Sequence, residues 1–217
     1  LGRDMLSRVI YGARISLVVV AVTLGVGLVI GVIAGLLAGW YGRWIDELMM
    51  RIVDIKLALP TILLALVLVL ALGQSFLIIV AILAIAVWPR FARNTRGEVL
   101  QLKTMDYVAL AKVAGASTPR ILFKHIFPGV VNTLIILASL EVGIVILLES
   151  TLSFLGAGVP PPTPAWGSMV ADGRDRLAVA WWISTMPGVA IMMVVLAMNL
   201  FGDWLRDKLD PRLRQLE

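Results

Sequence analysis

The chain has 217 residues, of which 60% are hydrophobic and 15% are charged, and its mean hydropathy is +0.96. A soluble domain is about 45–50% apolar and about 25% charged, so this composition excludes a single water-soluble core, intrinsic disorder and collagen-like repeats, and it indicates a membrane protein. The absence of cysteine excludes disulfide frameworks, zinc fingers, iron–sulfur sites and thiol nucleophiles.

Long stretches without charged residues mark the candidate membrane helices, because about 20 apolar residues cross the hydrocarbon core as an α-helix. The stretch at residues 57–89 contains the Gly-Gln-Ser turn signal at 73–75 and is therefore divided into two helices. A further span is crossed by a single charge, Glu141. The predicted spans cover residues 14–41, 46–72, 76–102, 129–150 and 179–202, between an external segment at 1–13 and a tail at 204–217.

Lysine and arginine set the orientation, because cytoplasmic loops carry an excess of both. Residues 42–56, 90–125 and 204–217 fall on one side of five alternating spans and hold three, seven and four basic residues, 14 of the 19 in the chain. The sequence therefore predicts a cytoplasmic C-terminus and leaves little support for reading the net charge of +5 as nucleic-acid binding. The basic segment 1–13 falls outside, where it translocates poorly unaided, so we expect a further helix upstream of it.

Four glycines in the first span recur at a spacing of four residues: Gly27, Gly31, Gly35 and Gly39. This spacing keeps them near one face of a helix. Because lipid provides little hydrophobic drive between helices, close approach through small residues supplies the packing. The ladder predicts a helix–helix contact, with a moving contact in a transporter as the alternative.

Two acidic residues lie in or near the fourth span, Glu141 and Glu149. An intramembrane carboxylate is a candidate for a functional group, so both are pathway candidates, while paired or water-facing carboxylates are the alternative. The chain has one histidine, no Gly-Lys pair of a phosphate-binding loop and no GxSxG motif, so we predict neither catalytic residues nor a metal site. Any active transport then takes its energy from an ion gradient or from another chain.

The loop at residues 104–125 has the pattern of two short helices. The first is predicted to start at Thr104, to carry Asp106 in its first turn, where the helix dipole favours an anion, and to end at Gly115. The second begins near Pro119, and Pro128 opens the next span. This loop is either a compact projection into the cytoplasm or an interfacial segment lying on anionic lipid.

Several longer motifs run in order along the chain: Leu1–Leu17, Asp106–Pro128, Ser150–Gly156, Pro161–Gly167 and Asn199–Pro211. Together they resemble the permease subunits of bacterial ATP-binding-cassette (ABC) importers, in the branch that handles dipeptides, oligopeptides and nickel. The second motif resembles the cytoplasmic EAA loop of that family, with Gly115 at the family glycine. In place of the Glu-Ala-Ala triplet it has Ala109-Leu110-Ala111, which removes the glutamate, although Asp106 lies one turn earlier.

The resemblance implies an all-α polytopic membrane protein with the type I ABC importer permease fold, whose transmembrane domain covers residues 14–203. A six-helix subunit is expected, of which this chain holds five transmembrane helices and a coupling helix in the 104–125 loop. That loop is expected to dock onto a separate ATPase. The residues implied in the coupling loop are Asp106, Ala109, Ala111, Gly115, Ala116, Arg120, His125 and Pro128.

The resemblance also implies partners and a location. The partners are a second, homologous permease, two ATPase subunits that hold ATP and Mg²⁺, an extracytoplasmic substrate-binding protein and the lipid bilayer, but no nucleic acid. The chain itself is expected to hold no cofactor. The location is the bacterial inner membrane, and residues 150–178, including Trp166, form the outer loop that could meet the binding protein.

The function implied by the resemblance is that of a peptide-importer permease, a transport subunit rather than an enzyme. The same machinery importing nickel or glutathione is the first alternative. An ion-coupled secondary carrier or channel is an alternative from another class, and it requires carboxylates such as Glu141 to titrate with transport. A membrane scaffold without transport activity is a third.

Overall fold

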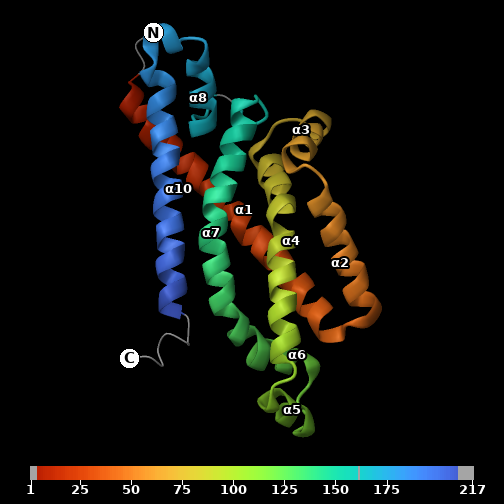
Figure 1. The fold of residues 1–217 in the computed structure, drawn as a ribbon. Coiled ribbons are helices and arrows are strands. Elements are labelled where there is room, and N and C mark those ends of the chain that lie inside the picture. Colours follow the sequence, from red (N-terminus) through yellow and green to blue (C-terminus); the bar gives the residue numbers. More distant parts are fainter. Residues whose placement is uncertain (1–3, 161, 210–217) are drawn as a thin grey trace.

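The computed structural model describes residues 4–160 and 162–209, and this part of the chain is helical without strands. The residues outside it are 1–3 of the expected external segment, Pro161 and 210–217 of the expected tail. Figure 1 shows the long helices side by side along one axis, with α1 crossing behind the others. Four helices are long and apolar enough to cross a bilayer: α1 (Met5–Tyr41), α4 (Phe76–Leu102), α7 (Phe127–Phe154) and α10 (Trp182–Leu209).

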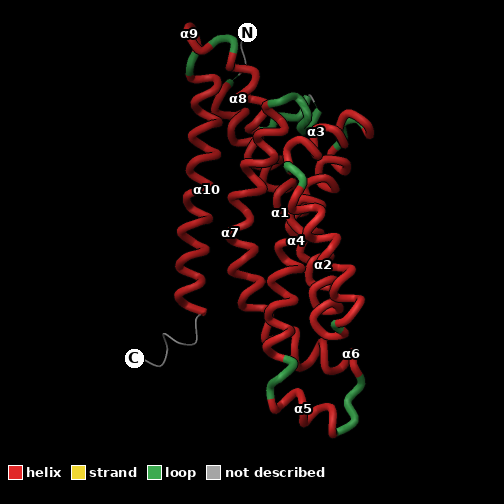
Figure 2. Tube along the Cα trace, turned by 45° about the vertical axis from the view of Figure 1, so that its right-hand side comes forward, coloured by secondary structure: helices red, strands yellow, loops and turns green. Residues whose placement is uncertain are grey.

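The remaining helices are shorter. They are α2 (Arg43–Ala58), α3 (Thr61–Leu72), α5 (Asp106–Val113), α6 (Thr118–Ile121), the π-helix η1 (Leu122–Ile126), α8 (Trp166–Arg174) and α9 (Leu177–Ala180). Because α6 and η1 run directly into α7, the apolar helix of that region extends over Thr118–Phe154. Figure 2 shows α10 on one side of α7, and α4 and α2 on the other.

The expected single helix over 46–72 is wrong, because α2 and α3 meet at an angle of 90°. Pro60 has no backbone N–H to donate, and Leu59 before it adopts an extended conformation with φ −82° and ψ 132°. The described part of the chain therefore has five spans only if this bent pair counts as one.

The charged residues of α2 contact α4 along its length instead of forming a charged segment at the end of a membrane span. Arg93 of α4 contacts Asp54 at 2.5 Å, and the Nη2 of Arg96 donates to Asp46 at 2.6 Å. The Nζ of the buried Lys56 donates to the carbonyl of Ala86 at 2.6 Å. These contacts place a charged helix beside α4, which an apolar-window argument does not anticipate.

Several helices differ in length from the expected spans. α4 covers the expected range of 76–102. α1 begins at Met5, nine residues before the expected position 14. It begins there because the Asp4 carboxylate caps the helix by accepting hydrogen bonds from the backbone N–H groups of Leu6 and Ser7, at 3.3 and 3.0 Å. A hydrogen bond from the Ser7 hydroxyl lowers the pKa of Asp4. α7 extends beyond 129–150 at both ends, and α10 starts three residues after 179 and continues seven past 202.

The four glycines of the ladder lie against α4. A Cβ on Gly31 would lie 2.5 Å from the Cβ of Phe91 and 2.6 Å from the carbonyl oxygen of Trp88. A Cβ on Gly35 would be equally close to Thr95. Gly27 and Gly39 meet Val87 and Val99 in the same way. α1 and α4 therefore run in the same direction and cross at a distance that only glycine permits.

At the end of the bundle opposite α5, α8 packs into the molecule rather than projecting from it. Trp166 is buried, and its Nε1 donates to the carbonyl of Val9 in α1 at 2.9 Å. Met169 is also buried. Trp166 is therefore enclosed by the bundle, so it is not the residue through which the expected outer loop 150–178 could meet a binding protein.

Candidate functional site

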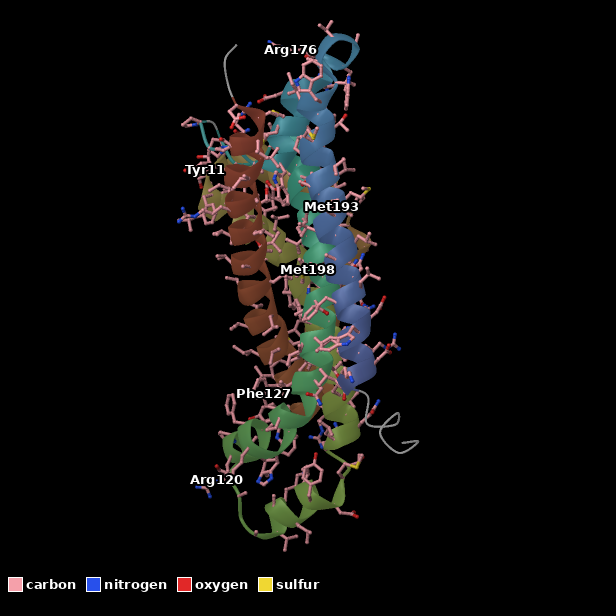
Figure 3. All side chains as sticks on the ribbon, turned by 90° about the vertical axis from the view of Figure 1, so that its left-hand side faces the viewer. Tyr11, Arg120, Phe127, Arg176, Met193 and Met198 are labelled. Carbon is pink, nitrogen blue, oxygen red and sulfur yellow. The ribbon has the colours of Figure 1, made fainter. Side chains whose placement is uncertain are left out.

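The segment between α4 and α7 projects from one end of the bundle (Figure 1), and we name residues 103–126 the α5–α6 projection. Figure 3 shows Arg120 in this projection, at the opposite end of the molecule from Arg176. The expected helix start at Thr104 is wrong. The Thr104 hydroxyl donates to the carbonyl of Gln101 at 2.7 Å and so terminates α4, and α5 begins two residues later.

The α5–α6 projection is fixed to the bundle by buried apolar residues and two lysines. Val108 and Ile126 are fully buried. The Nζ of Lys112 lies 4.6 Å from the centre of the Trp40 ring, and the Nζ of Lys103 donates to the carbonyl of Gly39 at 2.8 Å. The projection therefore follows the ends of α1 and α4 as one piece.

The turn at Gly115 sets the direction in which the chain leaves α5. Gly115 has φ +76°, and its N–H donates to the carbonyl of Lys112 at 3.0 Å. The N–H of Ala116 donates to the carbonyl of Ala111, also at 3.0 Å. This pair of bonds is the Schellman motif, whose positive φ favours glycine.

The outer face of the projection is apolar. Leu110 is 68% exposed, Val113 is 86% exposed and Phe123 is 68% exposed. Large apolar side chains this exposed at one end of a molecule indicate a contact surface. Sequence reasoning missed these residues, although Leu110 and Val113 stand three positions apart on a short helix. Of the residues predicted in this loop, Ala111, Ala116 and His125 are half-buried, whereas Asp106, Ala109, Gly115, Arg120 and Pro128 are exposed.

The two acidic pathway candidates lie in different surroundings. Glu141 accepts a hydrogen bond from the Nη1 of Arg90 at 2.7 Å. Glu149 is buried and accepts from the hydroxyls of Ser16 at 3.3 Å and Ser153 at 2.8 Å. Glu149 thus joins α1 to α7, and Glu141 joins α4 to α7.

A polar seam runs between α4 and α7 from Glu141 toward the α5–α6 projection. Arg90 and Glu98 lie two turns apart on α4 and meet Glu141 and Thr133 of α7. The Thr133 hydroxyl donates to Glu98 Oε1 at 2.8 Å. Between these pairs, Asn94 donates from Nδ2 to the carbonyl of Arg90 at 2.9 Å. The antiparallel register therefore gathers polar groups that the sequence separates by 35 to 51 positions.

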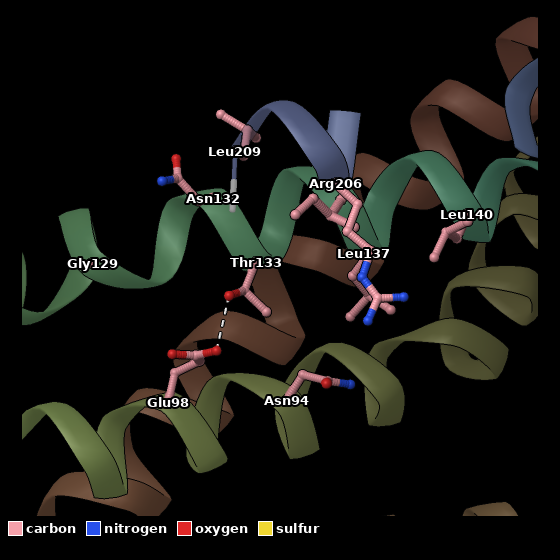
Figure 4. Close-up of a pocket in the computed structure, with 10 residues that line it drawn as sticks. Asn94, Glu98, Gly129, Asn132, Thr133, Leu137, Leu140, Arg206 and Leu209 are labelled. Atoms are coloured by element: carbon pink, nitrogen blue, oxygen red, sulfur yellow. Dashed lines mark hydrogen bonds between the residues drawn. The ribbon is translucent and has the colours of Figure 1, made fainter. Parts of the chain in front are cut away.

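A cavity of about 530 Å³ opens beside this seam and is lined by residues of α4, α7 and α10 (Figure 4). We name it the α4–α7–α10 groove. It lies at the end of the bundle that carries the α5–α6 projection, since α4 ends and α7 begins next to it. Its polar side chains are Asn94 and Glu98 from α4, Asn132 and Thr133 from α7, and Arg206 from α10.

The Arg90–Glu141 pair makes an asymmetric prediction about stability. The Glu141 side chain is 3% exposed and that of Arg90 is 45% exposed. Replacing Arg90 with alanine leaves the buried Glu141 carboxylate without its ion-pair partner and is expected to lower the unfolding free energy by about 3 kcal/mol. Replacing Glu141 with alanine leaves a guanidinium that reaches water and is expected to cost about 1.5 kcal/mol.

Chemical denaturation of the purified protein in detergent measures both values, and the Arg90→Leu/Glu141→Leu double variant should recover most of the loss. Arg93→Ala serves as control, because its pair with Asp54 is solvent-exposed and is worth less than about 1 kcal/mol. Equal losses for the two single variants would contradict the burial described.

Comparison with known proteins places this geometry in context. A profile of the family described as "Binding-protein-dependent transport system inner membrane component" matches residues 27–215. The dipeptide transport system permease protein DppC of Escherichia coli (strain K12) is 52% identical over 214 residues, 99% of this chain and 71% of that protein. The glutathione transport system permease protein GsiD of Salmonella paratyphi A is 47% identical over 216 residues, with the same coverage of 99% and 71%.

The fold is also found among solved structures. A chain of the MetNI methionine ABC transporter in an inward-facing conformation superposes with a TM-score of 0.74, covering 95% of this chain and 98% of that chain. The two sequences are 18% identical, so this likeness concerns the fold alone.

Proposed function

Because the chain belongs to the family of binding-protein-dependent transport system inner membrane components, we propose that it is the membrane-spanning permease subunit of an ATP-driven peptide importer. It is a multi-pass protein of the inner membrane with the type I ABC importer permease fold, and it is a transport subunit. The relatives named for dipeptide and for glutathione transport support a substrate class that consists of short peptides, glutathione included.

The observation that carries this proposal is the α5–α6 projection. It is fixed to the ends of α1 and α4, it leads directly into α7, and it exposes Leu110, Val113 and Phe123. Such a surface suits docking into an apolar cleft of an ATPase subunit. Motion imposed on the projection would shift α4 relative to α7 and so change the α4–α7–α10 groove that lies between them.

The remaining components follow from the family. Two ATPase subunits would hold ATP and Mg²⁺, a second homologous permease would complete the pathway, and an extracytoplasmic binding protein would deliver the substrate. We place the C-terminus and the α5–α6 projection in the cytoplasm, as the excess of basic residues in 90–125 and 204–217 supports. The projection and the ATPases are then on the same side.

Charge placed on the exposed face of the projection tests this function. The Leu110→Asp/Val113→Asp variant is expected to reduce ATP-dependent uptake of a labelled dipeptide by at least about tenfold, because a desolvated carboxylate opposes docking. The measurements are uptake into proteoliposomes that contain the whole complex, and co-purification of the ATPase subunits with the permease.

The matched control is Leu110→Met/Val113→Ile, which keeps both positions apolar and should retain wild-type uptake. Membrane levels of both variants should equal the wild type, since neither side chain is buried. Full uptake and full ATPase retention in the aspartate variant would refute the docking role, and uptake that survives ATP depletion would favour an ion-coupled carrier.

A further inference from the structure

The α4–α7–α10 groove presents one carboxylate and one guanidinium to the same cavity. Glu98 comes from α4 and Arg206 from α10, and Figure 4 shows both among the side chains that line the space between these helices. Within residues 4–160 and 162–209, neither side chain forms an ion pair. Both charged groups face the same cavity, so the groove suits a ligand that carries both a positive and a negative group.

The other polar groups of the groove suit a peptide unit. Asn94 and Asn132 each have an amide that donates and accepts, as the backbone of a peptide requires. Thr133 donates to Glu98 Oε1 and so orients the carboxylate while the second oxygen, Oε2, accepts no hydrogen bond from the described residues. The apolar wall of the groove includes Leu137 and Leu140, which lie on α7 together with Asn132 and Thr133.

The volume of the groove and the charges of its lining residues restrict the chemistry of the ligand further. A volume of about 530 Å³ lies within the range of about 300–1,000 Å³ that small-molecule sites occupy. An anionic headgroup or inorganic phosphate could pair with Arg206 but would be repelled by Glu98. A ligand with a free ammonium at one end and a free carboxylate at the other satisfies both.

We propose that the α4–α7–α10 groove binds a short peptide by its two ends: Glu98 receives the free ammonium, Arg206 receives the free carboxylate, and Asn94 and Asn132 bond the peptide unit. The assignment rests on the proposed function and adds the substrate chemistry of this chain. Because the apolar wall makes no directional bond to the peptide's side chains, the groove is indifferent to peptide sequence and selective for unblocked ends.

The test pairs charge-removing variants with end-blocked peptides. The complete transport complex in proteoliposomes is assayed for uptake of labelled Ala-Ala, N-acetyl-Ala-Ala and Ala-Ala-amide. Arg206→Gln is expected to reduce uptake of Ala-Ala about tenfold while leaving uptake of Ala-Ala-amide at the wild-type level, because the amide has no carboxylate to lose. Glu98→Gln is expected to reduce uptake of Ala-Ala about tenfold and to leave N-acetyl-Ala-Ala unchanged.

Each variant is compared with the wild type on the same peptide, so any preference of the binding protein for unblocked ends cancels. Lys208→Gln on α10 and Glu47→Gln on α2 are the matched controls, since neither residue lines the groove, and both should behave as wild type. Arg206→Lys keeps the charge and should restore most of the uptake of Ala-Ala, which guards against a variant that merely misfolds.

Equal losses on all three peptides, or no loss on any, would overturn the assignment of the peptide ends and leave the proposed function standing. A wild-type complex that takes up none of the three in the presence of ATP would instead refute the proposed function. A loss confined to the two peptides that carry the free end bound by the altered residue would establish the assignment.

Discussion

Replacing Gly31 with alanine is expected to destabilise the protein by about 3 kcal/mol. The added Cβ would lie 2.5 Å from the Cβ of Phe91, 2.6 Å from the carbonyl oxygen of Trp88 and 3.0 Å from the amide nitrogen of Ala92. Two of these three atoms belong to the backbone of α4, which cannot rotate away. The helices must therefore separate, and the contacts along the rest of the ladder weaken with them.

The matched control is Gly25→Ala, in the same helix. A Cβ there meets no atom within 4 Å in the described part of the chain, so this variant should be neutral or slightly stabilising, since alanine favours the helix. Denaturation in detergent and yield from membranes measure both. Equal stability of the two variants would show that α1 and α4 do not approach as closely as described.

Replacing Gly115 with valine is expected to abolish most uptake without lowering the amount of protein in the membrane. Gly115 has φ +76°, a conformation that costs a β-branched residue about 1–3 kcal/mol. A Cβ here meets no atom of the described residues within 4 Å, so the strain is confined to the turn. Relief of that strain re-aims α5 and displaces Leu110 and Val113, and ATP-dependent uptake should fall by at least about tenfold.

Two further variants separate conformation from size. Gly115→Asn adds a side chain of similar bulk but tolerates positive φ, and it should retain more uptake than the valine variant. Gly97→Val adds the same side chain in α4, at the same end of the bundle, where φ is not positive and the Cβ meets no atom within 4 Å among residues 4–160 and 162–209. This variant should transport normally. Wild-type uptake in Gly115→Val would remove the turn from the coupling role.

Part of the candidate site could be predicted from local pattern alone. The turn at Gly115 and the short helix before it follow from capping preferences, which act over a few residues. The glycine ladder follows from the spacing of four in a helix. Glu141 stands out because a carboxylate in an apolar span is rare. In each case the signal lies within one element, so no knowledge of its neighbours is needed.

The rest of the site depends on register between elements. Arg90 and Glu98 stand eight positions apart on α4, but only the antiparallel packing of α7 brings Glu141 and Thr133 opposite them. Arg206 lies 80 residues beyond the end of the α5–α6 projection, and it enters the groove because α10 packs against α7. The hydrophobic periodicity within one segment does not indicate which residues of another helix will lie opposite it.

Hydropathy, charge and capping are properties of contiguous residues, and they were enough to predict a membrane protein built from apolar helices with a short two-helix loop between two of them. The 90° angle between α2 and α3, the pairing of the α2 charges along α4 and the contact of the glycine ladder with α4 became visible in the folded chain. Those outcomes depend on which helix surfaces fit together and which polar side chains meet across them, and that condition links residues far apart in the chain.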